Sequence, residues 1–109
     1  MGMRRNIALQ YGTEKPEIYL YTHWDAQTLH TTLAFSLDRA RERWSDASYL
    51  ARVIFTDMTK SAGDDLTGYG LAPYEMDEEY PTITVHLENK TVNGVPFEDF
   101  VKNPQMFAV

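Results

Sequence analysis

The stretch Tyr19-Leu20-Tyr21-Thr22-His23-Trp24-Asp25 marks the change from strand to helix on which the predicted fold depends. Because side chains alternate between the two faces of a strand, its two tyrosines and His23 share one face, and Leu20 lies on the opposite, apolar face. Asp25 suits the N-cap position of a following helix, where its carboxylate would accept a backbone N–H. The aromatic face can stack a flat ligand and hydrogen-bond it. The stretch therefore predicts both a strand-to-helix junction and a candidate site.

A second strand is expected before this stretch. Residues 4–11 alternate in polarity, with Ile7 and Leu9 on one face. Residues 12–16 have the Gly, Pro and polar side chains of a turn. Residues 4–23 are therefore predicted to form a β-hairpin with a longer loop.

Two helices are predicted in the middle of the chain. The first runs from Asp25 to Trp44, and the second follows Ser45-Asp46 and ends near Gly63, which suits a helix C-terminus. The short link between them favours two neighbouring helices packed antiparallel or at a steep angle. Each carries a single apolar stripe, formed by Leu29, Leu33, Leu37, Ala40 and Trp44 in the first and by Leu50, Val53, Ile54 and Met58 in the second.

The remaining chain returns to strands. Residues 67–73 contain two glycines and a proline, which favours an irregular edge strand. Residues 82–88 alternate as a clear strand, and 91–93 are predicted to form a short return strand whose register is left open by the Asn93-Gly94 turn signal. A small helix is expected from Pro96.

This order predicts one α+β domain spanning residues 1–109, with residues 103–109 as a loosely ordered tail. We expect a two-layer sandwich. Its sheet is mostly antiparallel with four to five strands, two long helices cover one face, and a short helix lies at the C-terminus.

Composition limits the classes of function. The 109 residues have a net charge of −6 and no cysteine, which disfavours nucleic-acid binding and excludes thiolate metal sites and cysteine nucleophiles. No apolar run is long enough to cross a bilayer, and the basic N-terminus lacks a signal-peptide core, so we expect a cytoplasmic protein. Acidic residues gather at 64–65 and 75–79, whereas arginines gather at 4–5 and between 39 and 52.

The candidate site begins with His23, which can act as a general base, a metal ligand or a hydrogen-bond donor to a bound anion. It can also simply be a half-buried ring satisfied by a backbone carbonyl. Asp25 can orient His23 or cap the helix. Trp24 can stack a ligand or close the end of the core. Tyr21 shares the His23 face.

Further candidates surround these residues. Arg5 can pair with a phosphate or carboxylate if it lies beside His23, and His86 can share a surface with Tyr21 if their strands are neighbours. No metal-ligand spacing occurs, and neither a metal nor a cofactor is expected. Small residues that let backbone amides approach a ligand, or that simply form a bulged edge strand, are Thr67, Gly68, Tyr69 and Gly70.

Six segments of the chain form a recognisable set of motifs: Met1–Ile7, Ile18–Trp24, Arg43–Phe55, Thr67–Gly70, Glu79–Pro81 and Phe97–Val101. Together they resemble a family of small uncharacterised proteins from tailed phages, prophages and actinobacterial genomes. In many members a glycine or serine follows His-Trp, where this chain has Asp25-Ala26. The resemblance implies a phage or prophage accessory protein that acts in a bacterial cytoplasm and interferes with, or tunes, a host process.

Three functions follow as hypotheses, and the first two need no catalysis. The first is a binding protein that sequesters a small anionic or nucleotide-like ligand on the aromatic face. The second is a protein–protein modulator that docks its acidic loops on a basic host protein. The third is a small hydrolase with His23 as its base. A homodimer is compatible with each.

Overall fold

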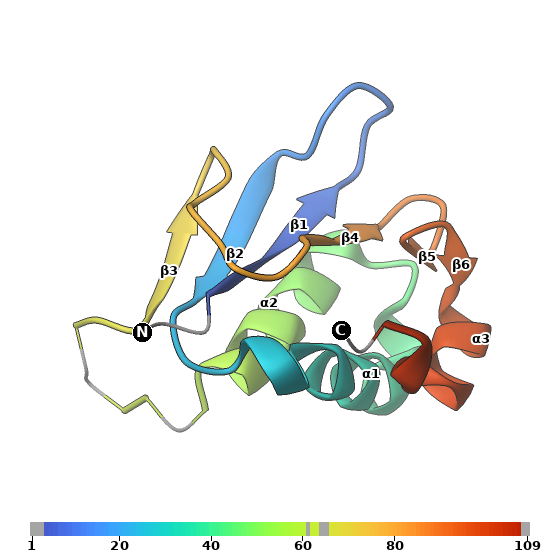
Figure 1. Ribbon diagram of the computed structural model, residues 1–109. Helices are drawn as coiled ribbons and strands as arrows, with labels where there is room; N and C mark the ends of the chain where they lie inside the picture. The colour runs from blue at the N-terminus through green and yellow to red at the C-terminus, as the bar shows by residue number, and fades with distance from the viewer. Residues whose placement is uncertain (1–3, 61, 64–65, 108–109) are drawn as a thin grey trace.

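The computed structural model describes residues 4–60, 62–63 and 66–107, and it shows an α+β domain with a sheet on one side and helices on the other (Figure 1). The strands are β1 (Arg5–Gln10), β2 (Ile18–Thr22), β3 (Tyr69–Ala72), β4 (Ile83–His86), β5 (Thr91–Val92) and β6 (Val95–Pro96). The helices are α1 (Leu29–Arg39), α2 (Ala47–Met58) and α3 (Phe97–Lys102), with short 3₁₀ turns at Ala26–Thr28, Arg41–Arg43 and Pro104–Phe107. The α+β class is confirmed.

The sheet has six strands in the order β3-β2-β1-β4-β5-β6, rather than the four to five expected. Four pairings are antiparallel, but β1 and β4 run parallel, with Ile7 opposite Ile83. The parallel pair arises because the chain leaving β3 turns back across the sheet before β4 begins (Figure 1). We call this returning segment, residues 73–82, the strap.

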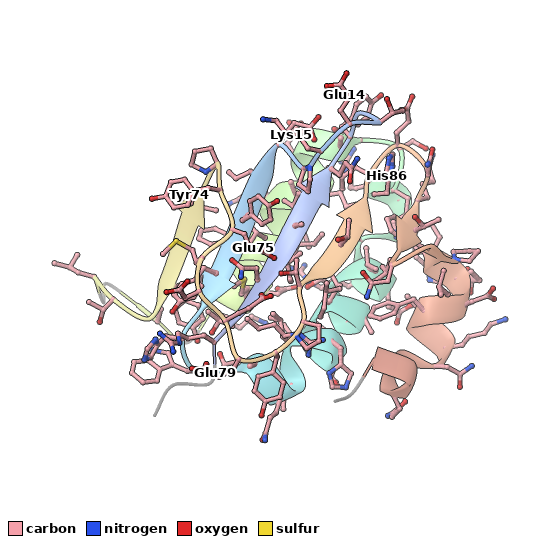
Figure 2. All side chains as sticks on the ribbon, turned by 45° about the horizontal axis from the view of Figure 1, so that its top comes forward. Glu14, Lys15, Tyr74, Glu75, Glu79 and His86 are labelled. Atoms are coloured by element: carbon pink, nitrogen blue, oxygen red, sulfur yellow. The ribbon has the colours of Figure 1, made fainter. Side chains whose placement is uncertain are left out.

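The predicted alternation of the strands is confirmed on the helix side of the sheet. Ile7, Leu20, Ile83 and Val85 are all at most 1% exposed, and they form one cluster with the apolar stripes of α1 and α2. The opposite face, which we call the outer face, carries no helix and is crossed by the strap (Figure 2).

The first long helix is shorter than the predicted range from Asp25 to Trp44. Its regular part, α1, ends at Arg39, and Ala40 leaves the helical conformation. The Trp44 indole N–H then donates to the Leu37 carbonyl oxygen at 2.8 Å, which uses an acceptor that a continuing helix would need. The helices α1 and α2 are neighbours across the short link, as expected.

Asp25 does precede the first helical turn, Ala26–Thr28, but the prediction that its carboxylate caps this turn is wrong. Its carboxylate makes no capping hydrogen bond. The hydroxyl of Thr22 instead accepts the backbone N–H groups of Trp24 and Asp25, each at 3.2 Å, and so turns the chain out of β2. The Asp25 carboxylate is thereby left for another partner.

At the C-terminal end, the uncertain register resolves into a small hairpin. Asn93 and Gly94 both have positive φ, at 49° and 85°, as a two-residue hairpin turn requires. Pro96 precedes α3 as its N-cap rather than starting it. The 3₁₀ turn Pro104–Phe107 packs against α1, and residues 108–109 of the predicted tail lie outside the described residues. In the part of the chain described, no helix has the length and apolar character to span a bilayer.

Candidate functional site

Three of the predicted site residues form a continuous group at the end of β2, which we call the aromatic rim: Tyr21, His23 and Trp24. The Tyr21 hydroxyl lies 3.1 Å from Nδ1 of His23. The His23 and Trp24 rings meet edge to face, with centroids 4.7 Å apart. Trp24 is 55% exposed and His23 is half-buried, so the helices do not seal the rings away from solvent.

Gly68 fixes the position of the rim. Its carbonyl oxygen accepts the His23 backbone N–H at 2.8 Å, which extends the β2–β3 pairing beyond Thr22. A Cβ atom on Gly68 would lie 2.1 Å from Nε1 of Trp24, and the residue has a φ of +97°. Only glycine meets both conditions, because it has no side chain and adopts positive φ without strain.

The neighbouring residues of β3 complete this end of the sheet. The Tyr69 hydroxyl donates to the Asp25 carboxylate at 2.6 Å. Burial, together with this hydrogen bond and the Asp25 charge, raises the pKa of Tyr69 to about 12, so it stays protonated as a donor. Gly70 pairs with Tyr21, and Thr67 is exposed in the approach to Gly68.

Arg5 does not join the rim. It lies on the helix side of the sheet and is 2% exposed. Its Nε donates to the Pro81 carbonyl oxygen at 2.7 Å and its Nη1 to that of Ala26 at 3.2 Å. Burial lowers the pKa of Arg5, but its charge is held by backbone oxygens rather than offered to an anion.

His86 lies at the other end of the outer face (Figure 2). It pairs with Gln10 on β1, whereas Tyr21 pairs with Asn6. Four residues along a strand separate the two positions by about 13 Å. Nε2 of His86 lies 3.1 Å from the Gly12 carbonyl oxygen, in the loop between β1 and β2. Its Nδ1 accepts the backbone N–H of Asn89, in the loop after β4, at 3.1 Å.

An ion pair that sequence reasoning missed borders the rim. Arg4 donates to both carboxylate oxygens of Glu79 through its guanidinium, and its backbone N–H donates to Oε1 at 2.8 Å. In return, the Glu79 backbone N–H donates to the Arg4 carbonyl oxygen at 3.1 Å. These hydrogen bonds, and the Arg4 charge, lower the pKa of Glu79 to about 2.

The strap is fixed on the outer face by Asn6, which is fully buried. The Asn6 amide donates to the carbonyl oxygen of Met76 and to the carboxylate of Glu78, and its oxygen accepts the Met76 N–H. Within the strap, the Thr82 hydroxyl lies within hydrogen-bond distance of the carboxylates of both Glu75 and Glu78 and has one proton to donate. The only sequence signal for this arrangement is the placement of acidic residues 75–79 against the basic residues 4–5.

The rim presents aromatic edges and carboxylates rather than a deep cavity. A pocket of about 570 Å³ lies away from the rim, between the hairpin loop 12–17 and Pro73. The cation that borders the rim, Arg4, is already paired with Glu79. No group of three histidine or carboxylate residues within the described ranges is placed to hold a metal ion.

Neither a protein-family model, nor a curated protein, nor a solved structure matches this chain.

Proposed function

We propose that the protein is a binding module whose strap docks on a basic surface of a partner protein. The observation that supports this most directly is the anchoring of the strap by Asn6, which leaves the side chains of Glu75, Asp77 and Glu79 exposed. Figure 2 shows Glu75 and Glu79 on the strap in front of the sheet.

Rigidity and charge both favour this role. A segment that is already held in place loses less conformational entropy on binding than a free loop. Asp77 is exposed and forms no ion pair with any described residue, so its charge is available to a partner. Clustered carboxylates on a chain of net charge −6 also speed the encounter with a basic surface.

The same geometry disfavours a small anionic ligand at the rim. A phosphate would have to displace Glu79 from Arg4, and Arg5 faces away from the rim among backbone oxygens. The surrounding carboxylates would repel it.

A flat ligand without a strong negative charge is a second candidate. The observation favouring it is the exposed Trp24 ring, which is held between the His23 edge and Gly68. A rigid, exposed indole is a stacking surface for a base or another planar ring.

The resemblance to phage and prophage proteins suggests where the partner is found. We propose a host protein of a bacterial cytoplasm whose activity is tuned when the strap occupies its basic surface. Catalysis plays no part in this proposal.

The test is capture from a bacterial lysate with immobilised protein, quantified by mass spectrometry. We expect a partner that is retained by the wild type and lost by the double variant Glu75→Lys/Asp77→Lys. A matched control, Glu14→Lys/Glu88→Lys, reverses two exposed carboxylates outside the strap and should retain it. Partner binding should weaken as salt is added. Equal capture by both variants, or no enriched protein, contradicts the proposal.

The second candidate is tested by native mass spectrometry of protein purified from the same cells. A retained small molecule that disappears in Trp24→Ala but persists in Tyr49→Ala would support it, because both side chains are 55% exposed and only Trp24 lies on the rim. Loss of the ligand in neither variant would contradict it.

A further inference from the structure

The free edge of the sheet carries an apolar surface that lies outside the strap, and only its Trp24 is shared with the aromatic rim. The sheet ends in β3 on one side and β6 on the other. Seven large hydrophobic side chains are prominently exposed in the part of the chain described, and four of them lie on β3 or around its ends. They are Leu66 at 97% exposed, Tyr74 at 63%, Trp24 at 55% and Leu71 at 53%.

The backbone of β3 offers hydrogen bonds along this edge. Because His23 donates to Gly68 in the β2–β3 ladder, Gly70 and Ala72 also face β2 in the alternating pattern of antiparallel pairs. Tyr69 and Leu71 therefore direct their N–H and C=O groups away from the sheet. Such an edge pairs readily with another strand unless charges or a covering element prevent it.

The edge segment itself carries no charged side chain. Residues 66–74, Leu-Thr-Gly-Tyr-Gly-Leu-Ala-Pro-Tyr, contain no ionisable group that is charged at neutral pH. Two copies of a chain with net charge −6 can therefore meet along this segment without like charges facing one another directly.

We propose that β3 pairs antiparallel with β3 of a second copy, so that two sheets join into one across a two-fold axis at Gly70. In the register that we propose, Tyr69 of each copy exchanges hydrogen bonds with Leu71 of the other, because both residues direct their backbone groups outward. Four backbone hydrogen bonds result. The two copies of Gly70 meet at the axis as a non-hydrogen-bonded pair, where strands approach most closely and where the absence of side chains leaves room.

The side chains of this register match one another. On the helix side, Leu71 of each copy lies opposite Tyr69 of the other. Leu66 and Tyr74 flank the two ends of β3, so these exposed side chains lie beside the paired strands. Each copy thus covers exposed apolar side chains of the other copy, as a self-complementary two-fold interface requires.

An apolar pocket extends this surface toward α2. It has a volume of about 210 Å³ and includes Leu71, Leu20 and Phe55 in its lining. The proposed pairing would border this pocket with the second copy, and it would place both straps on the same side of the joined sheet. The dimer would then present two acidic surfaces to a partner, although its formation does not depend on the strap having one.

Sedimentation and light scattering across about 1 µM to about 1 mM protein would test the proposal directly. We expect the wild type to reach twice the mass of one chain and Leu71→Lys to remain a monomer, because lysine on an edge strand opposes pairing. Tyr11→Lys is the matched control, since Tyr11 is similarly exposed at 51% and lies away from β3. It should dimerise as the wild type does.

Amide hydrogen exchange of the wild type separates this interface from any other and does not depend on how the variants fold. Protection of the Tyr69 and Leu71 amides should rise at least tenfold between the monomeric and dimeric concentrations. A chain that stays monomeric throughout overturns the proposal. So does a dimer in which these two amides exchange at unchanged rates, or one in which Leu71→Lys folds and still dimerises.

Discussion

The carboxamide of Asn6 makes hydrogen bonds with both the carbonyl oxygen and the N–H of Met76. Its Nδ2 donates to the Met76 carbonyl oxygen at 2.9 Å, and its Oδ1 accepts the Met76 N–H at 3.2 Å. Nδ2 also donates to Oε1 of Glu78 at 2.8 Å. A single buried side chain of β1 thus holds a segment that is 70 residues away in sequence.

Replacing this side chain should loosen the strap. We expect Asn6→Ala to lower the free energy of unfolding by about 2–3 kcal/mol, because three hydrogen bonds are lost at a buried position. Asn6→Asp should cost more at neutral pH, since its second oxygen would face the Met76 carbonyl and the Glu78 carboxylate. Urea unfolding measures both changes. Hydrogen exchange should show faster exchange of the Met76 amide.

The control for these variants is Asn89→Ala, which removes an exposed asparagine side chain outside the strap. It should unfold like the wild type. A fully stable Asn6→Ala protein would show that other contacts hold the strap.

Gly68 is expected to be intolerant of any side chain. Gly68→Ala adds a methyl group 2.1 Å from the Trp24 ring nitrogen and strains a residue with positive φ. Gly94→Ala imposes similar backbone strain, at a φ of +85°, with no atom within 4 Å of its Cβ. We therefore expect Gly68→Ala to be the more destabilising by about 1–3 kcal/mol.

Tryptophan fluorescence should report the same clash. The emission of Trp24 should shift in Gly68→Ala and stay unchanged in Gly94→Ala. In the Trp24→Ala background, the extra cost of Gly68→Ala should disappear. Equal destabilisation by the two glycine substitutions would show that backbone strain alone matters.

Because of His30, the free energy of unfolding should decrease as the pH falls below neutral. It is 5% exposed, and no described group hydrogen-bonds its Nδ1. Burial first, and then the nearby Arg5 charge, lower its pKa below the ordinary value of 6.5. The unfolded chain therefore binds a proton that the folded chain does not. The stability associated with neutral His30 is complete above pH 6.5 and declines as the pH falls toward the folded pKa.

His30→Leu removes the titratable imidazole and puts an apolar side chain of similar length in its place. Relative to the wild type, it should become progressively more stable as the pH falls from 8 to 5, measured by thermal unfolding at each pH. A difference in stability that stays constant over this range would contradict the assignment.

Asp57 connects the two long helices through its side chain. It accepts the Ser36 hydroxyl at 2.7 Å and two guanidinium N–H groups of Arg39 at 3.0 and 2.9 Å. Burial acts to raise the pKa of Asp57, but these hydrogen bonds and the nearby positive charges outweigh it and lower the pKa. The stability that the carboxylate adds is present at neutral pH and is lost as the pH falls through the folded pKa.

Asp57→Ala should lower the free energy of unfolding by about 2–4 kcal/mol, because it leaves the buried Ser36 hydroxyl without its acceptor. Asp38→Ala removes an exposed carboxylate that pairs with Arg41, and it should have little effect. Chemical denaturation at pH 7 compares them. Similar losses in both variants would contradict a special role for the buried carboxylate.

The strands and helices could be predicted because each repeats its own local pattern. Ile7 and Leu9 share one face of β1, and the apolar residues of α2 recur at helical spacing. Both of these predicted core faces are confirmed. Arg5 has the same parity as Ile7, a signal that it points toward the helices. The residue type opposes that signal, because a guanidinium is seldom buried. The predicted pairing of Arg5 with an anion required it to lie beside His23, and its place on the helix side of the sheet does not meet that condition.

The strap and the parallel pairing could not be predicted in this way. Residues 73–82 have neither helical nor strand periodicity, and their position depends on Asn6, far away in the chain. The β1–β4 pair has the same cause, because only the returning strap makes β4 run in the direction of β1. The aromatic rim was predicted from a single strand, whereas the ion pair that borders it joins two distant segments.

The place of β1 between β2 and β4 has a consequence for the chain as it is made. A ribosome adds about 5–20 residues per second, so β4 emerges about 4–15 s after β1. By the end of that interval, β2 and both long helices have been synthesised. The edge of β1 that will pair with β4 still has no native neighbour. The nascent protein therefore passes through a stage in which the sheet is incomplete and one edge of β1 is unpaired. At this stage the chain has the greatest need of chaperones.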